Sequence, residues 1–157
     1  MTHIPRRAFI LSGLAALAAC SRTPEVADIA ADAPLYPGET PQIRALINHY
    51  ADLYDVPRSL VHRVVQRESN YNPSAHHRSY YGLMQILPQT AATMGHNGPT
   101  SELFDPDVNL RYGVKYLRGA WLLSDGDIDT AISWYARGYY YEAKRRGMLV
   151  ETGLRPA

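Results

Sequence analysis

The segment that decides the fold is RESNYNPSAHHRSYYGLMQILPQTA, residues 67–91. It holds one carboxylate, Glu68, and the next acid along the chain is Glu102. Glu68 continues a helical stripe of apolar side chains that includes Val61 and Val64, so we expect it to face the interior or a cleft. The position alone fits equally well a carboxylate that caps the following segment or pairs with a basic side chain there.

The elements on either side of this segment are predicted to be helices. Apolar side chains recur at helical spacing, and Pro73 disfavours helical geometry at Asn72, which ends the helix that carries Glu68. Cap residues, prolines and glycines predict the helix limits. The predicted helices are 41–54, 57–68, 88–95, 105–123, 128–136 and 139–146. No alternating strand pattern or internal repeat is present, so we expect a mainly all-α, single-domain fold with a cleft beside Glu68.

The N-terminal residues have the pattern of an export signal and a linker. Arg6 and Arg7 precede an apolar run that is too short to span a bilayer, which predicts a signal peptide over residues 1–19. Cys20 is the only cysteine of the chain. Residues 17–20 resemble a bacterial lipobox, so Cys20 is the expected lipid attachment site, although an ordinary secretory peptide with a nearby cysteine fits as well. Residues 20–39 are expected to form a flexible tether, and residues 40–157 the domain.

Arg6 and Arg7 bear on the export route, and Ser21 bears on the destination of the protein. Arg6 and Arg7 are similar to a twin-arginine signal, but they also fit the positive start of a general secretory signal. Ser21 after the cysteine favours the outer membrane over the inner one. We therefore expect an exported, periplasmic protein that is anchored to a membrane through its N-terminal lipid only.

Charge and composition exclude several other classes of partner. The chain has 16 basic and 15 acidic residues, so no overall positive charge favours nucleic acid. The basic cluster 144–146 is expected to end a helix, with a phosphate-binding patch as the alternative. His76 and His77 are adjacent and have no nearby Cys, Asp or Glu to complete a ligand set, so no metal is expected. We expect no cofactor and a monomeric protein.

Four motifs in order resemble the soluble lytic transglycosylase (SLT) domain, a lysozyme-like fold that cuts the glycan of peptidoglycan. The resemblance covers residues 41–146. Its motifs are Glu68-Ser69 with Asn72-Pro73, then residues 82–86 (GLMQI), then Asp105-Pro106 with Asn109, Gly113, Tyr116 and Leu117, and finally residues 133–138 (SWYARG).

The resemblance implies a reaction in which one carboxyl group serves two steps. Glu68 would protonate the oxygen between N-acetylmuramic acid and N-acetylglucosamine. It would then take the proton of the muramic acid C6 hydroxyl, which closes a 1,6-anhydro ring. Two-carboxylate glycosidases need a second acid, whereas residues 69–101 contain none. Glu68 must start protonated, so we expect apolar surroundings to raise its pKa.

The same resemblance implies the substrate-binding residues and two alternatives. The residues expected to contact the glycan are Ser69, Tyr81, Gly82, Met84, Gln85, Tyr135 and Tyr139. Arg137 stands where the family often has alanine in the motif Ala-Tyr-Asn-Ala-Gly, and Ala136 replaces its asparagine, so the polar contact of that asparagine is absent. A hydrolytic muramidase on the same fold and a non-catalytic wall-binding lipoprotein are the alternative functions.

Overall fold

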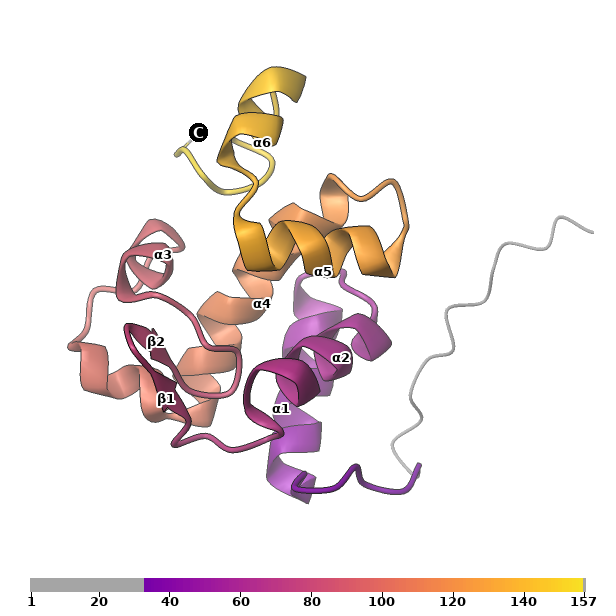
Figure 1. The fold of residues 1–157 in the computed structure, drawn as a ribbon, viewed down its shortest axis with the longest axis vertical. Helices are drawn as coiled ribbons and strands as arrows, with labels where there is room; N and C mark the ends of the chain where they lie inside the picture. Colours follow the sequence, from indigo (N-terminus) through magenta and orange to yellow (C-terminus); the bar gives the residue numbers. More distant parts are fainter. Residues whose placement is uncertain (1–32, 157) are drawn as a thin grey trace, which may run out of the picture.

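The computed structural model describes residues 33–156, and this part of the chain is mainly helical (Figure 1). The predicted signal peptide and Cys20 lie outside the described residues. The elements are α1 (Pro41–Leu53), α2 (Arg58–Ser69), β1 (His76–His77), β2 (Tyr80–Tyr81), α3 (Pro88–Thr93), the 3₁₀ helix η1 (Thr100–Phe104), α4 (Pro106–Leu122), α5 (Ile128–Arg137) and α6 (Tyr140–Arg146). The predicted fold class is confirmed.

Three helices begin where side-chain caps predict. The side chain of Thr40 accepts a hydrogen bond from the Ile43 N–H, and that of Asp127 accepts one from the Thr130 N–H. Asp105 accepts from two N–H groups of the first turn of α4. Each cap satisfies backbone donors that have no partner inside the helix. The C-cap of α2 is Asn70, whose φ of 51° lies in the left-handed region. The chain therefore turns away from the helix axis two residues after Glu68.

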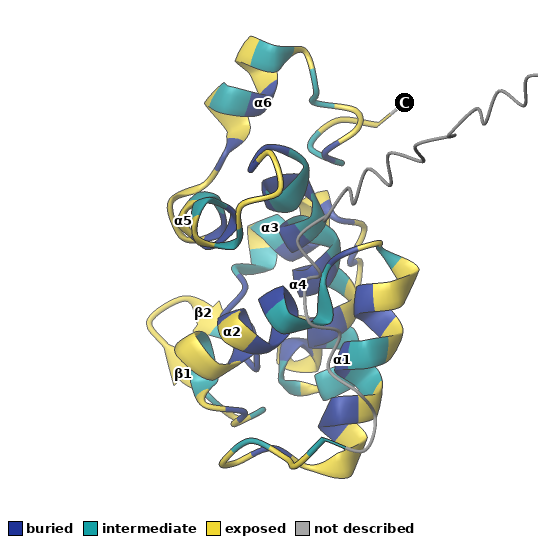
Figure 2. Ribbon diagram, turned by 90° about the vertical axis from the view of Figure 1, so that its right-hand side faces the viewer, coloured by how far each residue is buried: buried dark blue, intermediate teal, exposed yellow. Residues whose placement is uncertain are grey.

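The apolar stripes of the longer helices meet around α4, which packs against α1, α5, η1 and α3. Figure 2 shows the buried faces turned toward this centre. The main core combines residues from α1, α2, α4, α5 and α6. A second, smaller core of Ile86, Ala91 and Leu103 lies beneath α3 and η1. None of the helices in residues 33–156 has the length and apolarity needed to cross a bilayer.

A short hairpin follows α2 that the sequence pattern does not predict. His76 pairs with Tyr81 and His77 with Tyr80, in antiparallel register. Strands of two residues are too short for any alternating pattern to be visible. The hairpin matters because it brings His77 and Tyr80 to the hollow beside Glu68.

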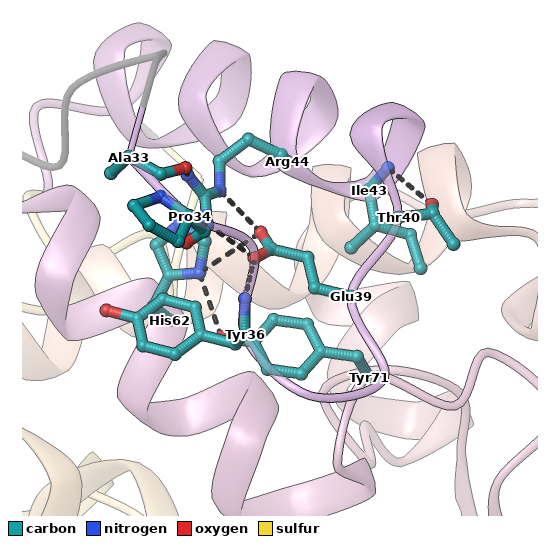
Figure 3. Close-up of polar contacts among 9 residues, drawn as sticks. All are labelled: Ala33, Pro34, Tyr36, Glu39, Thr40, Ile43, Arg44, His62 and Tyr71. Carbon is teal, nitrogen blue, oxygen red and sulfur yellow. Dashed lines mark hydrogen bonds and ion pairs between the residues drawn. The ribbon is translucent and has the colours of Figure 1, made fainter.

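The predicted tether is wrong for its last part, because residues 33–39 pack against the domain (Figure 3). The Glu39 carboxylate accepts hydrogen bonds from Arg44 at 2.6 Å and 2.5 Å, and both side chains are buried. Arg44 also donates to the carbonyl oxygens of Ala33 and Pro34, each at 3.1 Å. The Ala, Pro and Asp content of residues 21–39 and the lack of an apolar period suggested a linker, but Glu39, the one charged residue of 33–39, is paired with Arg44. The folded unit therefore includes residues 33–39.

His62 and Tyr71 complete this buried cluster from the α2 side. His62 Nδ1 lies 3.0 Å from the Tyr71 hydroxyl and 3.6 Å from Glu39 Oε1. His62 Nε2 is buried and has no hydrogen-bond partner among the described residues. Burial lowers the pKa of His62 to about 4, although the charge of Glu39 opposes this shift. His62 is therefore held neutral at ordinary pH.

Stability is expected to fall as the pH drops from about 6.5 toward 4. In this window the unfolded chain binds a proton at His62 and the folded chain does not, so the free energy of unfolding rises with pH by up to about 1.4 kcal/mol per unit. Burial opposes ionisation of Glu39, but hydrogen bonds from Arg44 and the Tyr36 N–H hold the pKa of its carboxyl below the usual value. Protonation of Glu39 at the acid end of the window therefore lowers the free energy of unfolding further. Urea unfolding at a series of pH values measures the slope.

The matched variant is His62→Leu, which cannot titrate at this position. Its absolute stability falls because Tyr71 loses its partner, but its slope between pH 6.5 and 4 is expected to be shallower than that of the wild type. Equal slopes would show that His62 titrates alike in both states.

Candidate active site

A hollow of about 310 Å³ lies beside Glu68 and is formed by three separate parts of the chain. Its lining residues are Arg67 and Glu68 from α2, His77 and Tyr80 from the hairpin, Gln85 from the following loop, and Tyr135 and Ala136 from α5. The structure thus brings together Glu68, Gln85 and Tyr135 of the predicted site.

Glu68 is partly withdrawn from water, as its place on the apolar stripe predicts. Its side chain is 24% exposed, and its contact with a basic group, Arg67 Nε, is 3.7 Å long. Burial raises the pKa of the Glu68 carboxyl, and the positive charge of Arg67 opposes this shift. The predicted direction of the pKa is confirmed. A carboxyl with a raised pKa is suited to give a proton to a bound substrate near neutral pH.

Glu68 is the only acidic side chain among the described residues that line this hollow. The nearest comparable group in an adjoining hollow is Asp129, which is paired with Arg63 at 2.7 Å. The site therefore has the donor for an acid step but lacks the second carboxylate that two-acid glycosidases place across the scissile bond.

Tyr135 forms a wall of the hollow, and its hydroxyl is directed into the protein. The hydroxyl donates to the carbonyl oxygen of Met84 at 2.8 Å. Burial raises the pKa of Tyr135 well above its usual range, and the negative charge of Glu68 adds to the shift. Because the Tyr135 hydroxyl donates its hydrogen bond to the Met84 carbonyl oxygen, it is not available to Glu68. The Tyr135 ring instead presents apolar surface beside Glu68, which disfavours the ionised carboxylate.

Gln85 is held in an unusual backbone conformation by its own side chain. Its φ is 47°, in the left-handed region that side chains other than glycine rarely adopt. The side-chain amide Nε2 donates to the carbonyl oxygens of Ala75 and Gly82 at 3.0 Å and 2.9 Å. The amide oxygen accepts from none of the described residues, and Gln85 lines the hollow. Gln85 can therefore offer an acceptor to a ligand while its nitrogen fixes the loop.

The structure corrects the expected roles of Gly82 and Met84. Gly82 has a φ of 71°, and a side chain there would come within 2.3 Å of Asn109 Nδ2 and the Leu103 carbonyl oxygen. Met84 is fully buried and packs against Gly113. Neither lines the hollow. Gly82 packs against η1 and α4, and Met84 packs against α4. These two residues therefore serve internal packing, whereas contact with sugar had been predicted.

Asn109 on α4 fixes this loop from behind, a role that its position in the third motif did not reveal. It is fully buried. Its Oδ1 accepts from the Met84 N–H at 2.9 Å, and its Nδ2 donates to the carbonyl oxygens of Tyr81 and Leu103 at 2.8 Å and 2.7 Å. One side chain thus ties the hairpin, the loop and η1 together.

An Asn109→Ala variant is expected to lower the free energy of unfolding by about 2–3 kcal/mol. The change removes the side-chain partner of the Met84 N–H and of the Leu103 carbonyl oxygen, and each such group costs free energy when it is kept from water. The Tyr81 carbonyl oxygen loses one bond but still accepts from the Ile86 N–H. Urea unfolding measures the loss. Asn97→Ala in an exposed turn is the control and should be nearly neutral. An Asn109→Ala protein as stable as the control would show that water or loop movement replaces these bonds.

Three other expected contacts are also placed away from the hollow. Tyr139 is 1% exposed, stacks on Tyr116 and donates to the Tyr116 carbonyl oxygen at 2.7 Å. Tyr81 stacks on His76, with ring centroids 4.6 Å apart. The Ser69 hydroxyl donates to the Val65 carbonyl oxygen within α2. These residues support the walls of the site, because their polar groups and rings are engaged with the protein.

Sequence reasoning missed part of a second hollow that continues the first. It measures about 170 Å³ and shares Tyr80, Gln85, Tyr135 and Ala136 with the hollow at Glu68. Its other lining residues are Ile86, Leu87, Thr90, Tyr116, Arg137 and Gly138. Tyr80 is 41% exposed and lies between the two. It is the aromatic side chain best placed to contact a ligand that fills both.

Within residues 33–156, no group of three or more His, Cys, Asp and Glu side chains is arranged to hold a metal ion. His77 lines the hollow at Glu68, whereas His76 stacks on Tyr81. The two histidines therefore have different surroundings, and they do not form a site together.

Comparison with known proteins relates this geometry to a family. The family model of the transglycosylase SLT domain matches residues 45–146. The match includes the helix of Glu68, the hairpin, the loop of Gln85 and the helix of Tyr135.

Relatives of known name are similar over part of the chain. Membrane-bound lytic murein transglycosylase C of Haemophilus influenzae is 37% identical over 92 residues, which are 54% of this chain and 25% of that protein. The protein of the same name from Mannheimia succiniciproducens is 35% identical over 89 residues, 52% of this chain and 24% of that protein. The one from Yersinia pestis is 39% identical over 80 residues, 46% and 22% of the two chains. The match thus spans about a quarter of these relatives.

Proposed function

The chain belongs to the transglycosylase SLT domain family, and on this premise we propose that it is a peptidoglycan lytic transglycosylase. Glu68 carries the proposal, because it is the only acid among the described residues lining the hollow and burial raises its pKa. The substrate is the β-1,4 linkage between N-acetylmuramic acid and N-acetylglucosamine. Tyr80 and Gln85 contact the glycan, and Tyr135 limits the access of water to Glu68.

The reaction has two proton transfers through the same carboxyl group. Protonated Glu68 gives its proton to the glycosidic oxygen as the bond to the anomeric carbon breaks, and the N-acetyl group of the muramic acid stabilises the resulting cation. The Glu68 carboxylate then accepts the proton of the C6 hydroxyl, whose oxygen bonds to the anomeric carbon. The products are a free N-acetylglucosamine hydroxyl and a 1,6-anhydro muramic acid end, and Glu68 is protonated again. No water is consumed.

Mass spectrometry of peptidoglycan digested with the purified protein tests this proposal. Released fragments are expected to end in 1,6-anhydro muramic acid, and each is lighter by one water than the corresponding hydrolysis product. Fragments with reducing ends alone would identify a hydrolytic muramidase. A digest without new glycan ends would favour a wall-binding protein that lacks the chemistry.

We also propose that the protein acts as a monomer on the periplasmic side of the outer membrane, held there by lipid on Cys20. The relatives are named as membrane-bound, and the lipobox-like sequence of this chain gives a means of attachment. Fractionation of cells that produce the wild type or a Cys20→Ala variant tests the anchor. Equal recovery of both proteins in the membrane fraction would show that Cys20 is not needed.

A further inference from the structure

A basic hollow lies next to the site and is lined by side chains of α2 and α5. Its volume is about 680 Å³, larger than that of the hollow at Glu68. The lining contains three arginines, Arg63, Arg67 and Arg137, and one acid, Asp129. Asp129 pairs with Arg63 at 2.7 Å, so two positive charges remain in excess. The remaining lining residues are Gln66, Ile132, Ser133 and Ala136.

The basic hollow is continuous with the hollow at Glu68. Arg67 and Ala136 line both, and Arg137 lines the basic hollow and the smaller one beyond Tyr135. A glycan bound at Glu68 therefore places its substituents within reach of the arginines. This region is concave, so it suits a short charged chain better than a flat surface such as a membrane.

The arginines are available to a ligand. The side chains of Arg63 and Arg67 are 51% and 57% exposed. Asp129 accepts a hydrogen bond from Nη2 of Arg63, and Glu68 lies 3.7 Å from Nε of Arg67, so the other N–H groups of each guanidinium can bind a ligand. The guanidinium of Arg137 lies 3.9 Å from the centre of the Trp134 ring, which restrains it and leaves its N–H groups at the edge. Planar N–H groups of this kind match the two oxygens of a carboxylate. In intact peptidoglycan the lactyl carboxyl group of muramic acid is amide-bonded to the peptide stem, so the sugar backbone has no charge to occupy them, whereas the stems end in free carboxylates.

We propose that this basic hollow binds the carboxylates of the peptide stem on the muramic acid next to the cleaved bond. The inference rests on the proposed function and adds to it a preference for glycan that still carries peptides over glycan stripped of them. Arg63 and Arg137 contact the stem, and Arg67 lies between the stem and Glu68.

Binding to two matched ligands tests the inference in the full chain with Glu68→Gln, which prevents turnover. One ligand is a GlcNAc–MurNAc oligosaccharide with its peptide stems. The other is the same oligosaccharide after an amidase has removed the stems and the freed lactyl carboxylates have been converted to methyl amides, so that it carries no charge. The Glu68→Gln protein is expected to bind the first about tenfold more tightly. Adding Arg63→Gln and Arg137→Gln is expected to remove this difference, because the affinity for the ligand with stems falls more than that for the ligand without them.

Adding Arg145→Gln and Arg146→Gln instead is the charge-matched control, since both arginines lie on α6 and pair with Glu142 outside the hollow. It should preserve the tenfold preference. The inference is overturned if the Glu68→Gln protein shows no preference, or if the two arginine changes weaken both ligands equally or weaken neither. Thermal melting verifies that each variant is folded.

The outcome is separate from that of the proposed function. Binding is measured without turnover, so a stem preference that depends on the arginines supports this inference whatever glycan ends the wild type produces. Conversely, anhydro products together with equal binding of the two ligands would support the reaction and exclude the stem site.

Discussion

A Glu68→Gln variant is expected to release glycan fragments at least about a thousandfold more slowly than the wild type. Glutamine has nearly the same shape, but it cannot protonate the glycosidic oxygen or accept the C6 proton. General acid–base catalysis by one group contributes about 10²–10⁴ in rate, and here the same group serves both steps. The release of soluble fragments from purified peptidoglycan measures the effect.

The loss must come from chemistry and not from unfolding. Because Glu68 is partly desolvated and its pKa is raised, replacing it by a neutral amide should leave the free energy of unfolding equal or slightly higher. Glu151→Gln, at an exposed residue, is the control and should keep full activity. If Glu68→Gln retained wild-type lysis, another group would have to supply the proton.

A Glu39→Gln variant is expected to lower the free energy of unfolding by about 3–5 kcal/mol. Arg44 is 4% exposed, and without Glu39 its charge has no carboxylate beside it. Removing one partner of a buried ion pair leaves an uncompensated charge away from water, which is among the most destabilising of single changes. Urea unfolding at pH 7.5 measures the loss, and at this pH His62 is neutral in both states.

Two comparisons separate the buried charge from the loss of an ordinary ion pair. Asp129→Asn breaks the exposed pair with Arg63 and is expected to cost less than about 1 kcal/mol. A Glu39→Leu, Arg44→Met double variant removes both charges and should be more stable than Glu39→Gln alone. A Glu39→Gln protein that unfolds like Asp129→Asn would show that Arg44 finds water in the folded state.

Local signals in the sequence were sufficient for the α-helices, whereas the 3₁₀ helix η1 was not predicted. Thr40, Asp105 and Asp127 each cap a helix through a side-chain oxygen within three residues of its donor, so the chemistry that starts the helix is contained in a few neighbours. Glu68 was found for the same reason, because the periodicity of α2 places it on the inner face. The packing of residues 33–39 was missed, because the burial of Glu39 depends on its contacts with Arg44 in α1 and His62 in α2.

The errors in the site have one physical cause. Gly82, Met84 and Tyr139 resemble residues that contact a ligand, and a sequence cannot show on which side of a loop or helix each side chain packs. The answer depends on Asn109, Gly113 and Gly119, which come from α4 and occupy the space behind them. Tyr80 and Arg137 line the hollows because the hairpin and the end of α5 lie close together in the fold. These two segments are distant in the sequence, so local patterns do not predict that they meet.

The arrangement around Arg44 also has a mechanical consequence. Tension applied to the chain before Ala33 acts first on the carbonyl groups of Ala33 and Pro34, which Arg44 holds. Because Glu39 binds the same guanidinium, the force is divided among several bonds at the first turn of α1, where Arg44 lies. A domain pulled by its N-terminal end would thus resist at this point.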